Sequence, residues 1–236
     1  MNTASAGPAG TLPPQPATPL LAVLSDALDE AGFVTETAPG ADDALTVTVY
    51  SSKAPWKETT PESANDWLAR NKIAATASLN DGDYVVITLS TAEAVSRFIA
   101  VALDPWLRVH TTADQLADAL EAHSLPHEVA VSAHFIELIL PDEGLSSAVQ
   151  LAALLGAPRL ADGLNLRRAR GMRRLAERIQ WLLTGVAGSD VDVIAEPGCA
   201  HAEDRLTIRS TVDQARLLTT RITDAPHGAV SVTRHN

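Results

Sequence analysis

The residues best suited to molecular recognition lie in one short segment near residue 170. Six of the chain's 18 lysines and arginines fall within the run RRARGMRRLAER at 167–178. At about 100° per residue, the apolar residues of this segment share one side of a helix. They are Met172, Leu175, Ala176, Ile179, Leu182, Leu183 and Val186. Trp181 falls on the opposite side, beside Arg174, Glu177 and Arg178. The sequence therefore places the indole among guanidinium groups, either exposed to solvent or packed against another part of the same chain.

Such a surface fits three kinds of contact. An exposed tryptophan ringed by arginines can bind an acidic protein surface, stack on a nucleic-acid base or pack against another helix. The third contact includes one within the same chain, because a helix in a layered protein can bury both faces. The candidate partner-binding residues are Arg167, Arg168, Arg170, Arg174, Arg178 and Trp181.

The net charge of -11 favours an acidic protein surface over nucleic acid as the partner. Nucleic-acid binding depends on a basic face that neutralises phosphates. We therefore expect a protein partner with an acidic surface first, and nucleic acid second. In the second case Arg173 would join the other arginines on the phosphates.

A possible nucleophile lies in the loop sequence EPGCAHAED. Cys199, His201 and Asp204 supply a thiol, an imidazole and a carboxylate. A working site needs an activated thiol and a base held by a third group. Residues two apart in a hairpin loop seldom provide that geometry, so we predict a polar loop and no catalytic residue. A small enzyme using Cys199 and His201 remains the less favoured alternative.

No sequence motif indicates a metal or a cofactor. The chain has seven histidines but no HExxH and no paired CxxC. The phosphate-binding pattern GxxxxGK[ST], the dinucleotide pattern GxGxxG after a strand and the hydrolase pattern GxSxG are also absent. The sequence therefore predicts no metal, no cofactor and no enzyme.

The elements that must position these residues follow one repeated order. In the first half we expect a helix, two strands, a helix, two strands and a final helix. The second half runs similarly, with two helices between its pairs of strands, at 145–155 and at about 172–186. The halves span 19–105 and 110–233, which predicts an α+β fold of two related halves, each an antiparallel sheet with helices packed on it. Asp104-Pro105 is expected to end a helix begun at Ala92, and a new helix is expected at Thr112. A capping box is expected from Ser90.

Two similar segments support the relation between the halves. TLSTAEA starts at Thr88, and TIRSTVDQ starts at Thr207. Both read as the end of a strand followed by Ser-Thr, an apolar residue and an acid. Ser or Thr caps a helix, and the acid suits the positive end of its dipole.

The composition predicts a disordered tail, a reducing compartment and no membrane association. Residues 1–18 carry no charge and are rich in proline and alanine, which predicts a disordered tail. A single cysteine excludes an intramolecular disulfide and favours a reducing, cytoplasmic compartment. No apolar run reaches the roughly 20 residues that span a bilayer, so we expect no membrane association.

The first half resembles the YbjN and type III secretion chaperone-like domains. The resemblance rests on WLARNKIAATASLNDGDYVVITLS, from Trp67 to Ser90. There a helix ends at Asn71, a strand follows, and the turn Asp81-Gly82 leads to a second strand and a helix. The second half departs from the pattern, because no third strand is expected between Leu140 and Leu145. The resemblance implies a non-catalytic module that binds other proteins.

Overall fold

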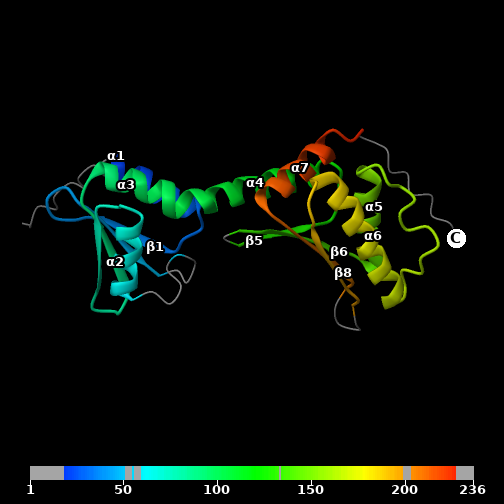
Figure 1. Ribbon diagram of the computed structural model, residues 1–236, viewed down its shortest axis with the longest axis horizontal. Coiled ribbons are helices and arrows are strands. Elements are labelled where there is room, and N and C mark those ends of the chain that lie inside the picture. Colours follow the sequence, from blue (N-terminus) through cyan, green and yellow to red (C-terminus); the bar gives the residue numbers. More distant parts are fainter. Residues whose placement is uncertain (1–18, 51–54, 56–59, 133, 199–202, 227–236) are drawn as a thin grey trace, which may run out of the picture.

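A computed structural model describes residues 19–50, 55, 60–132, 134–198 and 203–226. The predicted tail at 1–18, the candidate residues Cys199 and His201, and a possible last strand at 228–233 lie outside these residues. The described chain forms two four-stranded antiparallel sheets with helices packed on them, which confirms the predicted α+β fold of two halves. Figure 1 shows the two halves as separate lobes joined by a long helix.

Lobe 1 follows the expected order of elements. Its helices and strands are α1 (Pro19–Glu30), β1 (Thr35–Pro39), β2 (Leu45–Val49), α2 (Pro61–Arg70), β3 (Ala75–Leu79), β4 (Val85–Leu89) and α3 (Ala92–Phe98). The strands are arranged β1-β2-β4-β3 in the sheet. Alternate residues of the central strands are buried, as the alternation of apolar and polar residues in LTVTV requires.

Lobe 2 repeats that arrangement with one additional helix. Its elements are α4 (Asp104–Glu121), β5 (Glu128–Val131), β6 (Ile136–Pro141), a 3-10 turn (Glu143–Leu145), α5 (Ser146–Leu154), α6 (Ala169–Ala187), β7 (Asp192–Glu196), β8 (Arg205–Ser210) and α7 (Val212–Thr223). The strands are arranged β5-β6-β8-β7, the same order as in lobe 1. Thr91 and Thr211 cap α3 and α7 at equivalent places, so the two similar sequence segments occupy equivalent positions.

Two predictions about helix ends were wrong. The cap of α3 is Thr91, whose hydroxyl accepts a hydrogen bond from the Ala94 amide, and not Ser90. The helix also does not end at Asp104-Pro105. It continues from α3 through a π-helical segment (Ile99–Leu103) into α4, and in that segment the Asp104 amide donates to the Ile99 carbonyl, five residues back. A wider turn of this kind accommodates the missing amide of Pro105 and the bulk of its ring.

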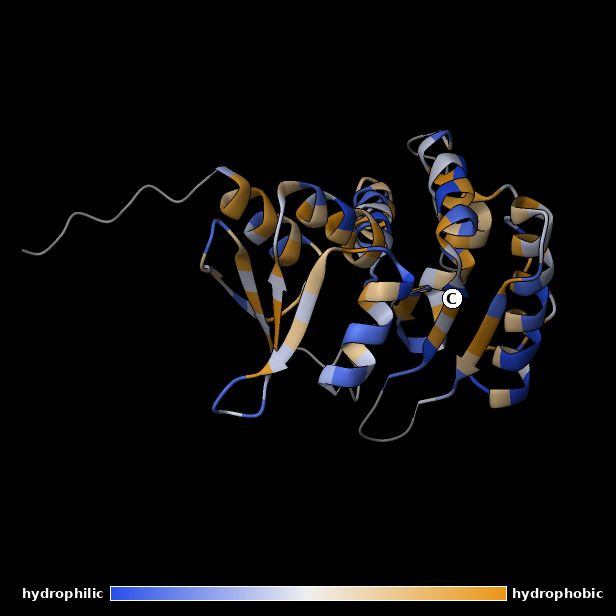
Figure 2. Ribbon diagram, turned by 60° about the vertical axis from the view of Figure 1, so that its left-hand side comes forward, coloured by the Kyte–Doolittle hydropathy of each residue, from blue (hydrophilic) through white to orange (hydrophobic). Residues whose placement is uncertain are grey.

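Each lobe has its own hydrophobic core. The first core extends along the sequence from Leu24 to Trp106 and the second from Val109 to Ala225. The two cores therefore meet within one turn of α4. Figure 2 shows hydrophobic residues concentrated on the strands and on the helix surfaces that face them. Phe33 and Trp106 contact edge to face, with ring centroids 5.7 Å apart, and join α4 to lobe 1.

One edge of the lobe 1 sheet is closed by a side chain. The Asn65 amide on α2 donates to the Ala77 carbonyl at 2.9 Å and accepts from the Ala77 amide at 2.8 Å. The side chain thus pairs with β3 as a neighbouring strand would. Open strand edges recruit other strands, so this pairing protects β3 from edge-to-edge association.

Candidate functional site

Helix α6 carries most of the candidate residues and packs on the edge of the second sheet. Its inner face contributes Met172, Leu175, Ala176, Ile179 and Leu183 to the lobe 2 core, each at most 4 % exposed. The helix contacts β7 and α7. The apolar spacing predicted this inner face, and Leu182 and Val186 at its margin are half-buried.

The opposite face of α6 points to solvent. Arg170, Arg174, Arg178 and Trp181 fall within about 80° around the helix, and all four are exposed. We call these four residues the Arg–Trp face. Trp181 is 78 % exposed, the highest value among the large hydrophobic residues that the structure describes. Within the part of the chain that the structure describes, no ring or cation–π contact joins Trp181 to another residue, and its exposure does not match the alternative of packing against that part.

The remaining candidate arginines surround the start of the helix. Arg168 is the N-cap residue of α6, without a capping side-chain hydrogen bond, and Arg167 precedes it in the loop. The Arg167 amide donates to the Asn165 side-chain oxygen at 3.1 Å. Arg173 is exposed beside the Arg–Trp face. The structure thus brings all seven predicted residues to one helix and its first turn.

The loop at 157–168 holds the first half of α6 in place. The Arg178 guanidinium donates from Nη1 to the Leu160 carbonyl at 2.6 Å and to the Asp162 carbonyl at 3.1 Å. Gly171 lies so close to the loop that a Cβ atom there would be 2.0 Å from the Asn165 carbonyl oxygen. Arg178 therefore also has a positioning role, and its guanidinium is fixed on the surface.

Gly171 and the loop contact were not recognised from the sequence. The available signal is a glycine inside a helical pattern, which costs about 1 kcal/mol relative to alanine and usually has a packing reason. Gly185 on the same helix has nothing within 4 Å of the position of a Cβ, so no such packing reason applies there.

The candidate nucleophile loop is described only in part. Of its three residues, Asp204 is described, and its carboxylate has a structural role. One oxygen accepts from the Gly144 amide at 2.9 Å and the other from the Gly198 amide at 2.7 Å. This carboxylate ties two turns of lobe 2 together.

The described histidines do not form a metal centre. Among the residues with described positions, no group of three or more His, Cys, Asp or Glu side chains is close enough to hold a metal ion. His127 Nδ1 lies 2.8 Å from the Leu125 carbonyl, and His123 Nε2 lies 3.0 Å from the Ile222 carbonyl. These two rings bind backbone groups at the ends of helices.

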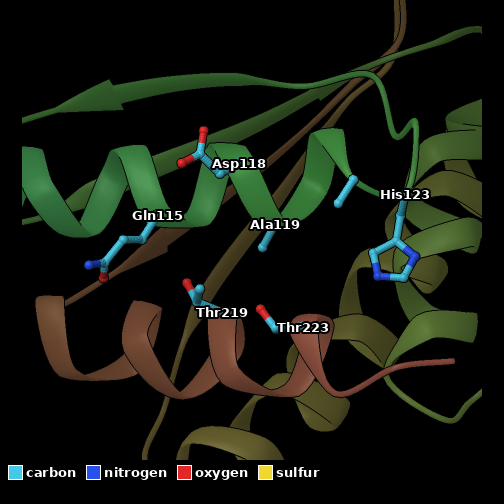
Figure 3. Close-up of a pocket in the computed structure, with 7 residues that line it drawn as sticks. Gln115, Asp118, Ala119, His123, Thr219 and Thr223 are labelled. Carbon is cyan, nitrogen blue, oxygen red and sulfur yellow. The ribbon is translucent and has the colours of Figure 1, made fainter. Parts of the chain in front are cut away.

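A shallow groove between α4 and α7 was not predicted. Its volume is about 400 Å³, and it is lined by Gln115, Asp118, Ala119, Ala122, His123, Thr219 and Thr223. Figure 3 shows Gln115 and Ala119 of α4 on the side that faces Thr219 and Thr223 of α7, whereas the Asp118 carboxylate points away from α7. Most of the lining side chains are small, and Asp118 is the only carboxylate among them, so the lining has no set of converging catalytic groups.

Both sheets also carry exposed aromatic side chains. On lobe 1, Tyr50 and Tyr84 contact edge to face at 4.8 Å, and the Tyr50 hydroxyl donates to Glu36 at 2.8 Å. That hydrogen bond, followed by burial and the charge of Glu36, raises the pKa of Tyr50 above its usual value. On lobe 2, Arg209 pairs with Glu137 at 2.6 Å and lies over the Phe135 ring. Unlike Trp181, these aromatic side chains already have partners on their own sheets.

The comparisons add no family to this description. The chain was compared with protein-family models, with curated proteins and with solved structures, and none of the three comparisons gave a match. In the part of the chain with described coordinates, no helix combines the length and apolar character needed to cross a membrane.

Proposed function

We propose that this chain is a non-catalytic, chaperone-like protein-binding module of the cytoplasm that recognises an acidic protein surface. The observation that carries the proposal is the 78 % exposure of Trp181 on a face with three arginines. Tryptophan and arginine are the residues most enriched among those that dominate binding energy at protein interfaces. The order of elements in lobe 1, on which the resemblance to YbjN-like domains rests, supports the same proposal.

The exposed indole provides a substantial driving force for association. An aromatic side chain buries roughly 200 Å² when it is fully covered, so an exposed fraction of 78 % leaves on the order of 150 Å². At about 25 cal/mol per Å², covering that area is worth about 4 kcal/mol before the costs of association. The arginines select for an acidic partner, because unlike charges steer the encounter and like charges oppose it.

Nucleic acid is the second candidate, on a separate observation. The guanidinium groups of Arg167, Arg168, Arg170, Arg173 and Arg174 are exposed, and no described acidic side chain forms an ion pair with them. A phosphate-bound complex would weaken steeply with salt, by about one unit of log K per log unit of salt for each phosphate neutralised. A protein complex centred on Trp181 would depend much less on salt.

The test is capture of partners from lysate of the source cell by the tagged full-length protein, with and without nuclease. Trp181→Ala and Arg174→Glu are expected to lose the partner, while wild type keeps it after nuclease treatment. Leu217→Ala is the matched control, because Leu217 is an apolar residue 46 % exposed on another helix. Partners that bind Trp181→Ala as well as wild type would contradict the proposal. Partners lost only on nuclease treatment would favour the nucleic-acid alternative.

A further inference from the structure

A second helix of the chain has a surface complementary to the Arg–Trp face. On the described helices, three large hydrophobic side chains are exposed, namely Val23 on α1, Trp181 on α6 and Leu217 on α7. Val23 shares one side of α1 with Asp26 and Glu30, within about 60° around the helix, and both acids are exposed. We call these three residues the acidic face of α1. Leu217 has no such single-sign surroundings, because the exposed residues four positions before and after it, Asp213 and Arg221, carry opposite charges.

Both helices carry charges that are unfavourable for their own dipoles. The last turn of α1 contains Asp29 and Glu30 and has no basic residue. The first turn of α6 has no acidic residue and includes Arg170, two residues after Arg168 at the cap. Acids destabilise the C-terminal end of a helix, and cations the N-terminal end, by about 0.3 to 1 kcal/mol each. Local choices that oppose folding in this way often mark functional sites.

An antiparallel contact between α1 and α6 compensates the unfavourable charges at the ends of both helices. It places the acidic C-terminal end of α1 beside the arginine-rich N-terminal end of α6. Charge, helix dipole and exposed apolar surface then all match in a single orientation.

We propose that the partner of the Arg–Trp face is the acidic face of α1 on a second copy of this chain. The inference rests on the proposed function and names the occupant of the same surface. The spacing fits, because Val23 and Glu30 are seven residues apart, as are Trp181 and Arg174. At 1.5 Å per residue both pairs span about 10.5 Å.

This register places three pairs of residues opposite one another. Val23 faces Trp181, Asp26 faces Arg178, and Glu30 faces Arg174. Glu177 is the single acid close to the Arg–Trp face, and it faces the small residue Ala27. The charges of α1 therefore meet arginines, and the like charge of Glu177 is not paired with an acid.

The contact must form between molecules, and it is head to tail. Figure 1 places α1 on lobe 1 and α6 on the far side of lobe 2, so one chain cannot bring its own two faces together. A symmetric pair of α6 helices would instead bring arginines against arginines, which repel. Lobe 1 is also the more acidic part, since residues 19–105 contain 13 acidic and 5 basic side chains.

A head-to-tail contact adds copies in a row unless it closes into a ring. Two helix faces form a small interface, and small interfaces are typical of weak, transient association. We therefore expect self-association of the full chain in the range of about 10 to 500 µM, with a mass that rises with concentration.

The test measures the mass of the full-length protein in solution by sedimentation and light scattering. Arg174→Glu and Glu30→Arg are each expected to weaken self-association by about tenfold or more. An equimolar mixture of the two variants is expected to recover self-association, with the two variants alternating along the row. The intact α1 of the first variant binds the intact α6 of the second. The arginine introduced in α1 of the second variant meets the glutamate introduced in α6 of the first, which restores a pair of opposite charges.

Matched controls reverse charges outside the proposed interface. Arg221→Glu on α7 and Asp81→Arg in the turn between β3 and β4 change exposed residues of the same types. Both are expected to self-associate as wild type does. Circular dichroism of every variant verifies that it is folded.

The possible outcomes separate the inference from the proposed function. Self-association that is lost in each variant alone and recovered on mixing the two supports the inference. A wild type that stays monomeric at 500 µM overturns it, as does self-association that survives Arg174→Glu. If that monomeric protein still captures an acidic protein through Trp181, the proposed function stands alone. If it captures nothing through Trp181, both are overturned.

Discussion

Gly171→Ala is expected to destabilise the protein although alanine is the better helix former. The new Cβ would lie 2.0 Å from the Asn165 carbonyl oxygen and 2.6 Å from the carbonyl carbon. Both atoms belong to the backbone, so the loop at 157–168 must move by more than about 1 Å to restore van der Waals contact. Overpacking of this kind typically costs about 1 to 3 kcal/mol, and moving the loop also disturbs the hydrogen bonds of Arg178 to Leu160 and Asp162.

The matched substitution Gly185→Ala in the same helix is expected to stabilise the protein. Gly185→Ala adds the same methyl group where nothing lies within 4 Å. The gain in helix propensity is then the main effect, about 0.5 to 1 kcal/mol in favour of folding. The same gain applies at Gly171, where it offsets part of the overpacking. Because this gain is common to both sites, the two variants should differ in free energy of unfolding by the overpacking cost alone, about 1 to 3 kcal/mol.

The assay is urea unfolding of both variants, followed by circular dichroism at 222 nm. The midpoint should fall for Gly171→Ala and rise for Gly185→Ala, with unchanged slopes. A Gly171→Ala variant as stable as Gly185→Ala would refute the reasoning, because the Asn165 carbonyl could not then lie against the helix. A fall in both variants would show instead that the helix does not tolerate added volume at either site.

Three other predictions concern contacts described above. Asn65→Ala removes two hydrogen bonds to the edge strand β3, and we expect a loss of about 1 to 3 kcal/mol in urea unfolding; a change below about 0.5 kcal/mol would contradict this pairing. Trp181→Ala should change stability by less than about 0.5 kcal/mol, whereas Leu183→Ala at 2 % exposure should cost about 2 to 5 kcal/mol. Glu36→Ala should lower the pKa of Tyr50. The titration can be followed by absorbance at 295 nm, because the chain has two tyrosines. An unchanged titration would exclude the hydrogen bond to Glu36 as the cause of the raised pKa. The raised pKa means that folding stabilises the protonated phenol, so this contribution is present below about pH 10 and is lost as the pH rises through the folded pKa of Tyr50.

The sequence predicted the α+β class and the orientation of α6 because both depend on periodic burial. The alternation in LTVTV gave a strand, and the apolar spacing from Met172 to Leu183 gave the inner face of α6. Periodicity also placed Trp181 opposite the core face, but it did not decide whether another part of the chain covers the indole, and its 78 % exposure came from the structure. Local periodicity was sufficient for the fold class and for the inner face of α6.

Features that depend on contacts distant in sequence were not predicted. The pairing of Asn65 with Ala77 across 12 residues has no periodic signal. The contact of Gly171 with Asn165 depends on the path of an irregular loop. The groove between α4 and α7 joins residues about 100 positions apart.

The helix break at Pro105 was wrong for a related reason. Local rules place a boundary before proline, because the preceding residue disfavours helical backbone angles. Asp104 nevertheless has helical angles, with φ -47° and ψ -42°. Burial of Leu103 and Trp106 on either side of the proline rewards a continuous helix, and the π-helical segment provides the space for it.

The position of Trp106 and Val109 in α4 bears on how the two lobes unfold. These residues lie three positions apart on one helix, yet they belong to different cores. A fragment cut at residue 105, the boundary that the sequence suggested, would leave lobe 1 without the indole that packs against Phe33. Unfolding of either lobe would likewise remove the packing from one side of the turn of α4 that contains Trp106 and Val109. The shared helix thus couples the stabilities of the two lobes. Unfolding of one lobe is expected to lower the melting temperature of the other.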